Sequence, residues 1–259
     1  MISLKKTITI IIPCFNEEKG IGKVIDSIPT KLLYRMGYYT DILVIDNSST
    51  DDTSAVALAR NVRVVHEPKK GKGYAIRRGM RSLLPETDYV VMMDGDNTYK
   101  AREIPRMIEP LANNFCDVVV GSRLGGKINK GSLKITNRLA NWGFTFLVRH
   151  IYMANVTDVL SGFFAWKKKV VKDLHPHLTS SGFAIEMEMI TKMVKLKHEV
   201  YSVPITYDVR VGHSKVSSVA DGLKILGMFF RNLSWTPDNS IIKKPKYTPS
   251  KTLSLDNNI

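Results

Sequence analysis

The sequence VVMMDGDNTY, residues 90–99, ends an apolar run with two aspartates, Asp94 and Asp96, that lie two positions apart. Side chains alternate along a β-strand, so residues two apart are expected on the same face. Two carboxylates at such short range repel each other unless a positive charge lies between them. The stretch therefore predicts a buried strand that ends in a pair of carboxylates suited to a cation.

Apolar runs of this kind recur along the first half of the chain and alternate with helical patterns. Strands are expected at residues 7–13, 41–46, 62–67, 88–94 and 117–123. Residues 21–28 and 104–111 each have apolar side chains at i, i+3, i+4 and i+7, which is the spacing of a helix with one buried face. This alternation predicts an α/β fold with a central, mostly parallel sheet flanked by helices.

The second half of the chain continues with longer helical patterns. Helices are expected at residues 133–152, 184–197 and 219–232, and one more strand at 199–209. From Trp235 onward the sequence loses its periodicity and contains several prolines, which is typical of a mobile tail. We therefore expect one domain over residues 1–234 and a mobile C-terminal tail over residues 235–259.

Composition narrows the class of protein. The 259 residues are 44% apolar, enough for a buried core, and their formal net charge of +14 favours an anionic partner. Zinc-finger spacing and the aromatic signature of RNA-binding domains are missing, which argues against nucleic acid. The cysteines Cys14 and Cys116 lack metal-ligand spacing, and no apolar run approaches the roughly 20 residues that span a bilayer, so a cytoplasmic protein is expected.

Acidic residues collect where the predicted strands end, which is where open α/β sheets bind ligands. Asp46 and Asp94 stand at the strand exits themselves, whereas Asn16, Ser49 and Asp51 are explained as ordinary helix caps. Basic or glycine-rich segments accompany these acids at residues 68–79, 121–123 and 210–215. A nucleoside diphosphate bridged to carboxylates by Mg²⁺ or Mn²⁺ would use both sets of residues. Neither a P-loop nor a G-x-G-x-x-G motif is present.

Eight motifs in a fixed order resemble one family of enzymes. They are IIPCFNEEKGI (11–21), LVIDNSSTDDT (43–53), KGKGYAIRRGM (70–80), MMDGDNTYKAREIP (92–105), DVVVGSRL (117–124), TDVLSGFFAWKK (157–168), GFAIEMEM (182–189) and RVGHSK (210–215). Together they resemble the family 2 glycosyltransferases of the GT-A fold, and among them the polyprenyl-phosphate sugar synthases such as dolichyl-phosphate mannose synthase. The resemblance implies that the domain is a nucleotide-sugar-dependent catalytic domain with a Rossmann-like sheet.

The resemblance also implies roles for individual residues on the donor side. The donor-binding positions would be Pro13, Phe15, Glu17, Asp46, Lys72, Asp94, Gly95, Asp96, Arg210 and Lys215. Asp94 and Asp96 would hold a divalent cation, Mg²⁺ or Mn²⁺, that bridges the diphosphate of the donor. Many synthases supply a glutamine as a third ligand where this chain has Thr98, and Asn97 or His213 could substitute for it.

On the acceptor side the matching positions are Arg123, Ser161, Gly162 and Glu188, and the implied catalytic residues are Asp94, Asp96, Arg123 and Asp158. A tight turn before a buried segment would explain Gly162 equally well. Glu186 and Glu188 lie two apart on a predicted helix, so at most one is expected to face the site, and Glu188 is the better match to the synthases. If Asp158 or a glutamate acted as a base, a hydroxyl acceptor would become more credible.

The function implied by the resemblance is the inverting transfer of mannose from GDP-mannose to a polyprenyl (dolichyl) phosphate, which is already ionised near pH 7 and needs no general base. The predicted helices around residues 137–152 and 219–232 combine basic with large apolar side chains. We therefore expect peripheral docking on acidic membrane at the inner face of the cell membrane. The alternatives are UDP-glucose as donor, a soluble acceptor, or an inactive nucleotide-binding or membrane-scaffold protein.

Overall fold

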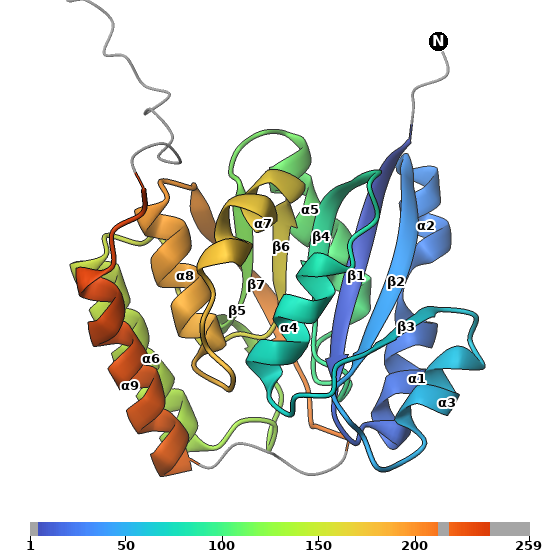
Figure 1. Cartoon of the computed structure of the whole chain (residues 1–259), viewed down its shortest axis with the longest axis horizontal. Helices are drawn as coiled ribbons and strands as arrows, with labels where there is room; N and C mark the ends of the chain where they lie inside the picture. Colours follow the sequence, from blue (N-terminus) through green and yellow to red (C-terminus); the bar gives the residue numbers. More distant parts are fainter. Residues whose placement is uncertain (1–4, 212–217, 239–259) are drawn as a thin grey trace, which may run out of the picture.

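The computed structural model describes residues 5–211 and 218–238 (Figure 1). Its strands are β1 (Lys6–Cys14), β2 (Tyr38–Asp46), β3 (Arg63–His66), β4 (Thr87–Met92), β5 (Val118–Ile128), β6 (Phe164–Lys167) and β7 (Val200–Tyr207). Its α-helices are α1 (Glu18–Ser27), α2 (Thr30–Arg35), α3 (Thr53–Leu58), α4 (Lys72–Arg81), α5 (Ile104–Ala112), α6 (Ile135–Ile151), α7 (Lys168–Leu174), α8 (Ile185–Lys195) and α9 (Ser218–Ser234). The 3₁₀ helices η1 (Ala101–Glu103) and η2 (His175–His177) complete these elements.

The strands form one sheet in the order β3-β2-β1-β4-β6-β5-β7. Neighbouring strands are parallel except around β6, which runs antiparallel to both β4 and β5. The predicted α/β class with a mostly parallel sheet is thereby confirmed, and each predicted strand is present. The loops that follow β1, β2 and β4 consequently meet at one edge of the sheet.

The strand with which the sequence argument began ends earlier than predicted. β4 stops at Met92, so Asp94 and Asp96 lie in the turn that follows, and strand alternation does not set the direction of their side chains. The turn is tight because Gly95 packs on Cys14, where an added Cβ would come within 2.6 Å of the sulfur. The backbone then passes through a left-handed conformation at Asn97, with a φ of 64°. The expectation that both carboxylates belong to the strand is therefore wrong.

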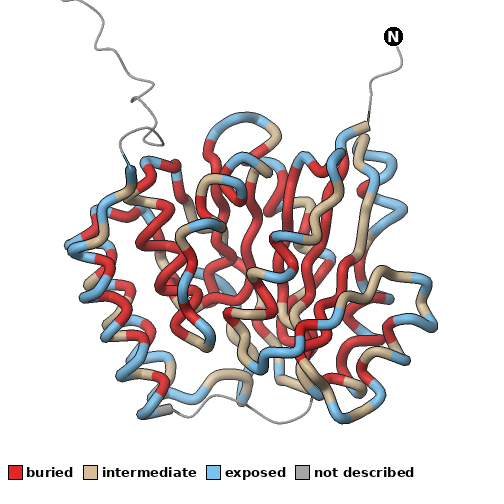
Figure 2. Tube along the Cα trace, in the orientation of Figure 1, coloured by how far each residue is buried: buried red, intermediate tan, exposed pale blue. Residues whose placement is uncertain are grey.

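Helices cover both faces of the sheet (Figure 1), and the strands between them are mostly buried (Figure 2). Each face has its own apolar core. Ile8, Ile10 and Ile12 of β1 point to the face covered by α1, α2, α3 and α5. Ile11 points to the opposite face, which α4, α6, α7, α8 and α9 cover. A continuous apolar run such as that of β1 is what a strand buried on both faces requires.

The chain remains packed immediately after α9. The ring of Trp235 lies 5.2 Å from Nζ of Lys192, and Nζ of Lys195 donates to the carbonyl oxygens of Leu233 and Trp235, both at 2.6 Å. Trp235 therefore contacts α8, and the boundary before it stays a prediction. The remainder of the predicted tail, from residue 239, lies outside the described residues. In the described part of the chain no helix is both long and apolar enough to cross a membrane.

Candidate active site

The first polar cluster at the carboxyl ends of the strands surrounds the ammonium group of Lys72. Lys72 opens α4, and its Nζ lies 2.8 Å from Oδ1 of Asp94 and 2.7 Å from Oε1 of Glu186. Burial would lower the pKa of Lys72, but the two carboxylates outweigh burial and raise it. Burial also raises the pKa of Glu186, and Lys72 offsets only part of that rise. One ammonium group thus joins the turn after β4 to helix α8.

Asp96 has a different positive partner. Its Oδ1 accepts hydrogen bonds from the backbone N–H of Thr98 at 3.0 Å and from the Thr98 hydroxyl at 2.6 Å, and its Oδ2 lies 2.8 Å from Nη1 of Arg210. Burial and the charge of Asp94 raise the pKa of Asp96 against the influence of Arg210. Arg210 lies here because the segment after β7 runs beside the turn, where Val211 N–H donates to the Asp96 carbonyl at 3.0 Å. The chain therefore supplies one cation for each carboxylate.

Glycines allow the backbone to approach this cluster closely. A Cβ on Gly73 would lie 2.1 Å from the carbonyl oxygen of Ser180, so the first turn of α4 can rest on that segment only without a side chain. A Cβ on Gly162 would lie 2.5 Å from Oδ2 of Asp94. These approaches fix the backbone on which Lys72 stands and bring the predicted acceptor-side residue Gly162 against a predicted donor-side one.

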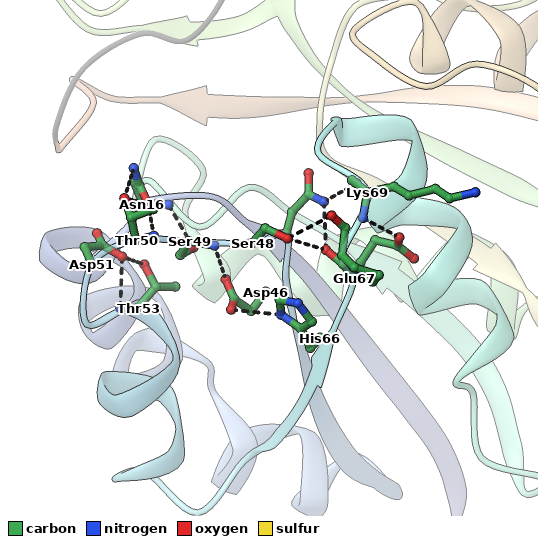
Figure 3. Close-up of polar contacts among 12 residues, drawn as sticks. Asn16, Asp46, Ser48, Ser49, Thr50, Asp51, Thr53, His66, Glu67 and Lys69 are labelled. Carbon is green, nitrogen blue, oxygen red and sulfur yellow. Dashed lines mark hydrogen bonds and ion pairs between the residues drawn. The ribbon is translucent and has the colours of Figure 1, made fainter.

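A second polar cluster surrounds Asp46 at the end of β2 (Figure 3). Oδ1 of Asp46 accepts a hydrogen bond from the N–H of Ser49 at 3.0 Å, and Oδ2 lies 3.4 Å from Nδ1 of His66. Burial would raise the pKa of Asp46, but hydrogen bonds from Ser49, Ser54 and His66 outweigh burial and lower it. Asp46 is therefore an anionic hydrogen-bond acceptor at neutral pH.

Side chains tie the loop after β1 to the loop after β2 (Figure 3). Oδ1 of Asn16 accepts from the N–H of Thr50 at 2.8 Å, and the N–H of Asn16 donates to Oγ of Ser49 at 3.0 Å. The predicted cap roles of Asn16 and Ser49 are wrong, because neither α1 nor α3 has a side-chain hydrogen bond from its N-cap residue. Asp51 does serve helix starts, since its carboxylate accepts from first-turn N–H groups of α1 and α3, both at 3.1 Å.

The loop after β2 is tied in turn to the segment that leads into α4. Oγ of Ser48 donates to the Glu67 carbonyl at 3.1 Å, and Nδ2 of Asn47 donates to the Lys69 carbonyl at 2.7 Å. Oδ1 of Asn47 accepts from the N–H of Gly71 at 2.7 Å. Hydrogen bonds therefore connect the loop that carries Asp46 to the start of the helix that carries Lys72.

The other predicted donor residues lie at the same edge or outside the described chain. Pro13 and Phe15 are half-buried at the exit of β1, and Glu17 is buried at the start of α1. Lys215 and the alternative metal ligand His213 lie outside the described residues, so the structure gives no account of them.

Arg123 and Asp158 form a buried ion pair. Nε and Nη2 of Arg123 donate to the carboxylate at 2.8 and 2.9 Å, and Nδ2 of Asn141 in α6 donates at 2.7 Å. Burial would raise the pKa of Asp158, but Arg123 and Asn141 outweigh burial and lower it. A general base works best with a pKa near the operating pH, and the partners of Asp158 favour its anionic form instead. Its carboxylate contacts Arg123, and its catalytic role stays a prediction.

The two glutamates of α8 have different partners. Glu188 accepts hydrogen bonds from the N–H groups of Thr179 at 2.9 Å and Ser180 at 2.7 Å, and it lies 2.6 Å from Nζ of Lys192. Through these contacts its carboxylate fixes the segment before α8, and its acceptor-side role stays a prediction. Glu186 is the glutamate that reaches the strand-end cluster, and sequence reasoning missed it.

The predicted acceptor residue Ser161 is fully buried. Its Oγ accepts from the N–H of Phe163 at 3.2 Å, while the N–H of Gly162 donates to the hydroxyl of Tyr99 at 2.6 Å. These bonds stabilise the turn itself, which agrees with the structural explanation of this segment. Gly162 still lines the cluster, because its backbone touches Asp94.

Asp94 and Asp96 suit a divalent cation. The charge of Asp94 helps to raise the pKa of Asp96, and within the described residues Oδ2 of Asp96 makes its ion pair with Arg210 but no hydrogen bond. No group of three or more His, Cys, Asp or Glu side chains that could hold a metal occurs in that part of the chain. Mg²⁺ often uses one or two carboxylates together with substrate phosphates, so this pair fits a cation that binds with a diphosphate. Thr98, at the place of a third ligand, is turned onto Asp96.

The fold and this site define a class of enzyme. The model of the family described as glycosyl transferase family 2 matches residues 9–175, and the chain belongs to that family. A solved structure of glucosyl-3-phosphoglycerate synthase from Mycobacterium tuberculosis, in complex with Mn²⁺, UDP and glucosyl-3-phosphoglycerate, has a TM-score of 0.69 at 23% identity. The likeness covers 90% of this chain and 82% of that one, and it confirms the GT-A fold.

Two relatives extend the comparison. The glycosyltransferase AglJ of Haloferax volcanii is 33% identical over 204 residues, which are 77% of this chain and 62% of AglJ. The dolichol-phosphate mannosyltransferase of Pyrococcus furiosus is 30% identical over 239 residues, which are 88% of this chain and 64% of that protein. The chain thus spans less than two thirds of the length of either relative.

Proposed function

We propose that this protein transfers a hexose from a nucleotide sugar to the phosphate of a polyprenyl phosphate. The observation that carries this proposal is the pair of carboxylates after β4, Asp94 and Asp96, each joined to its own basic side chain. Asp46, at the end of β2, lies at the same edge of the sheet and is proposed to bind the nucleoside. In a family 2 glycosyltransferase this arrangement suits a sugar nucleotide, and one relative is named a dolichol-phosphate mannosyltransferase.

The diphosphate of the donor is the group that the cluster would bind. Lys72 and Arg210 would neutralise its phosphate oxygens, and the anionic Asp46 would accept a hydrogen bond from the base or ribose. A Mg²⁺ or Mn²⁺ ion held by Asp94 and Asp96 would stabilise the leaving diphosphate as a Lewis acid. GDP-mannose is the first candidate donor because of the mannosyltransferase relative, and UDP-glucose is the second because the solved neighbour contains UDP.

The acceptor side favours a nucleophile that is already ionised. Asp158 is paired with Arg123, Glu188 with Lys192 and Glu186 with Lys72, so each carboxylate considered as a base already has a cationic partner. A lipid phosphate needs no base, because its oxygen is anionic near pH 7. This oxygen would attack the anomeric carbon while the bond from that carbon to the diphosphate breaks, with inversion of configuration.

Two neighbouring helices offer a surface for docking on a membrane. Figure 1 shows α6 and α9 side by side. Their exposed apolar side chains are Ile135, Leu139, Trp142, Phe146 and Ile151 on α6 and Val219, Leu223, Phe230 and Leu233 on α9; we call them the apolar stripe. Exposed basic residues beside the stripe are Lys134, Arg138, Arg149, Lys224 and Arg231. This combination suits an acidic lipid surface, and we propose a peripheral protein at the inner face of the cell membrane.

The test is a transfer assay with the purified chain, Mn²⁺ or Mg²⁺, and either GDP-mannose or UDP-glucose, with and without a short polyprenyl phosphate. We expect sugar transfer to the lipid from one donor, dependent on the cation. The variant Asp96→Ala should remain folded by circular dichroism and lose most of this activity.

Other results would point elsewhere. Cation-dependent hydrolysis of a donor without transfer to lipid would favour a soluble acceptor. Failure to bind or cleave either donor would favour a nucleotide-independent scaffold, and full activity of Asp96→Ala would remove the metal assignment.

A further inference from the structure

Lys72 is shared between a carboxylate that the proposed function assigns to a metal and one that it does not use. Its Nζ lies 2.8 Å from Asp94 and 2.7 Å from Glu186, so the two contacts are equally close. Glu186 is 4% exposed and comes from α8, whereas Asp94 lies in the turn after β4. A buried carboxylate at this position requires a positive partner, and Lys72 is that partner.

Backbone contacts hold Lys72 against the segment before α8. Gly73 N–H donates to the Ser181 carbonyl at 2.9 Å, and the approach of this turn to Ser180 leaves no space for a Cβ on Gly73. With the backbone held in this way, we expect a change in the partners of the ammonium group to come from rotation of the side chain. The ammonium will follow whichever carboxylate still attracts it.

A divalent cation at Asp94 would compete with the ammonium for the same oxygens and would repel it. We propose that Glu186 is a positioning residue, which keeps the ammonium of Lys72 beside the diphosphate subsite once the cation takes over Asp94. The proposal rests on the proposed function, because it assumes that a diphosphate and its cation bind here. Glu186 acts through Lys72 and has no contact with the donor.

The direction in which nucleotide affinity changes when Glu186 loses its charge distinguishes this positioning role from simple electrostatic repulsion. A carboxylate near a diphosphate repels it, so loss of that charge alone would tighten binding. A carboxylate that holds a lysine in place has the opposite effect, because its loss frees the lysine to turn away. The effect must also disappear when the lysine is absent, which a double-mutant cycle measures.

The experiment is calorimetric titration of UDP and of GDP into the protein at saturating Mn²⁺, for wild type, Glu186→Gln, Lys72→Met and the double variant. For the nucleotide that the wild type binds, we expect Glu186→Gln to raise Kd about tenfold, equivalent to about 1.4 kcal/mol. In the Lys72→Met background the same change should alter Kd less than about twofold. Glu186→Asp should recover part of the affinity.

The control is Glu199→Gln, which removes an equal charge from an exposed side chain before β7, at the opposite edge of the sheet, and should leave Kd unchanged. Tighter or unchanged binding by Glu186→Gln, or an equal loss in both backgrounds, would overturn the proposal while leaving the proposed function intact. If the folded wild type binds neither nucleotide with Mn²⁺, the proposed function fails and this proposal fails with it.

Discussion

The buried ion pair of Arg123 and Asp158 makes the free energy of unfolding depend on pH in the acidic range. The pKa of Asp158 in the folded protein lies below its ordinary value of about 3.9, because Arg123 and Asn141 outweigh burial. Stabilisation by a carboxylate with a lowered pKa is complete above the unfolded-state pKa and is lost as the pH falls through the folded-state pKa. The pair therefore contributes fully at neutral pH and loses its contribution below about pH 4.

We expect Asp158→Asn to lower the free energy of unfolding by about 3–5 kcal/mol at pH 7, since Arg123 stays buried without its counter-ion. Urea unfolding should show that this difference shrinks as the pH falls below about 4. The exposed Asp52→Asn should show no such trend. A difference for Asp158→Asn that stays constant down to pH 3 would contradict the explanation.

The sequence predicts which residues lie at the ends of the strands better than it predicts which side chains they pair with. Asp46, Asp94 and Asp96 follow strands of a parallel sheet, so their meeting at one edge is predictable from the order of elements. The partner of a buried carboxylate depends on tertiary contacts that no local pattern records. Glu186 and Glu188 are therefore indistinguishable in the sequence. The available signal is Lys72 between two glycines, because a lysine held there on a tightly packed backbone needs an anion nearby.

At the scale of the element, the start of α4 depends on the absence of a side chain at Gly73. A Cβ there would lie 2.1 Å from the Ser180 carbonyl oxygen, and a backbone atom cannot yield as a flexible side chain does. We expect Gly73→Ala to destabilise the protein by about 1–3 kcal/mol and to weaken nucleotide binding through displacement of Lys72. Chemical unfolding and calorimetric titration measure the two effects.

Gly222→Ala in α9 is the matched control, because nothing lies within 4 Å of its added Cβ. Alanine favours a helix over glycine by about 0.8–1.0 kcal/mol, so this variant should gain stability. Equal behaviour of the two variants would show that the contact with Ser180 does not position α4.

Elements with strong periodicity are predictable here, and short or interrupted ones are not. The apolar runs of β1 and β5 predict strands that are buried on both faces. β6 has four residues and no alternation, so its position between β4 and β5 follows only from tertiary pairing. The early end of β4 escapes prediction for a related reason, because the apolar run continues through Met93 after the ladder has stopped.

At the scale of the whole molecule, the apolar stripe and the net charge of +14 should act together in membrane binding. We expect Trp142→Ser/Phe146→Ser to lower binding to vesicles that contain acidic lipid by about tenfold, since two large apolar side chains would no longer enter the interface. Sedimentation with such vesicles at low salt measures the loss. Added salt should weaken wild-type binding as well, because it screens the basic residues.

Tyr34→Ser/Tyr39→Ser is the control for this experiment. It also removes two exposed aromatic rings, which are in contact with each other on α2 and β2, away from α6 and α9 (Figure 1). Vesicle binding should be unchanged in this variant. An equal loss in both double variants would indicate a general effect of surface aromatic residues rather than docking by the stripe.

Strand β6 lies between β4 and β5, which both precede it in the chain, and this order affects how the chain folds while it is being synthesised. A nascent chain that has emerged as far as Ile128 has made β4 and β5 but lacks the strand that joins them. Unpaired strand edges recruit other strands, so this intermediate is open to aggregation until Phe164–Lys167 leaves the ribosome. Four late residues then join the two parts of the sheet, and the growing chain is expected to depend on chaperones up to that point.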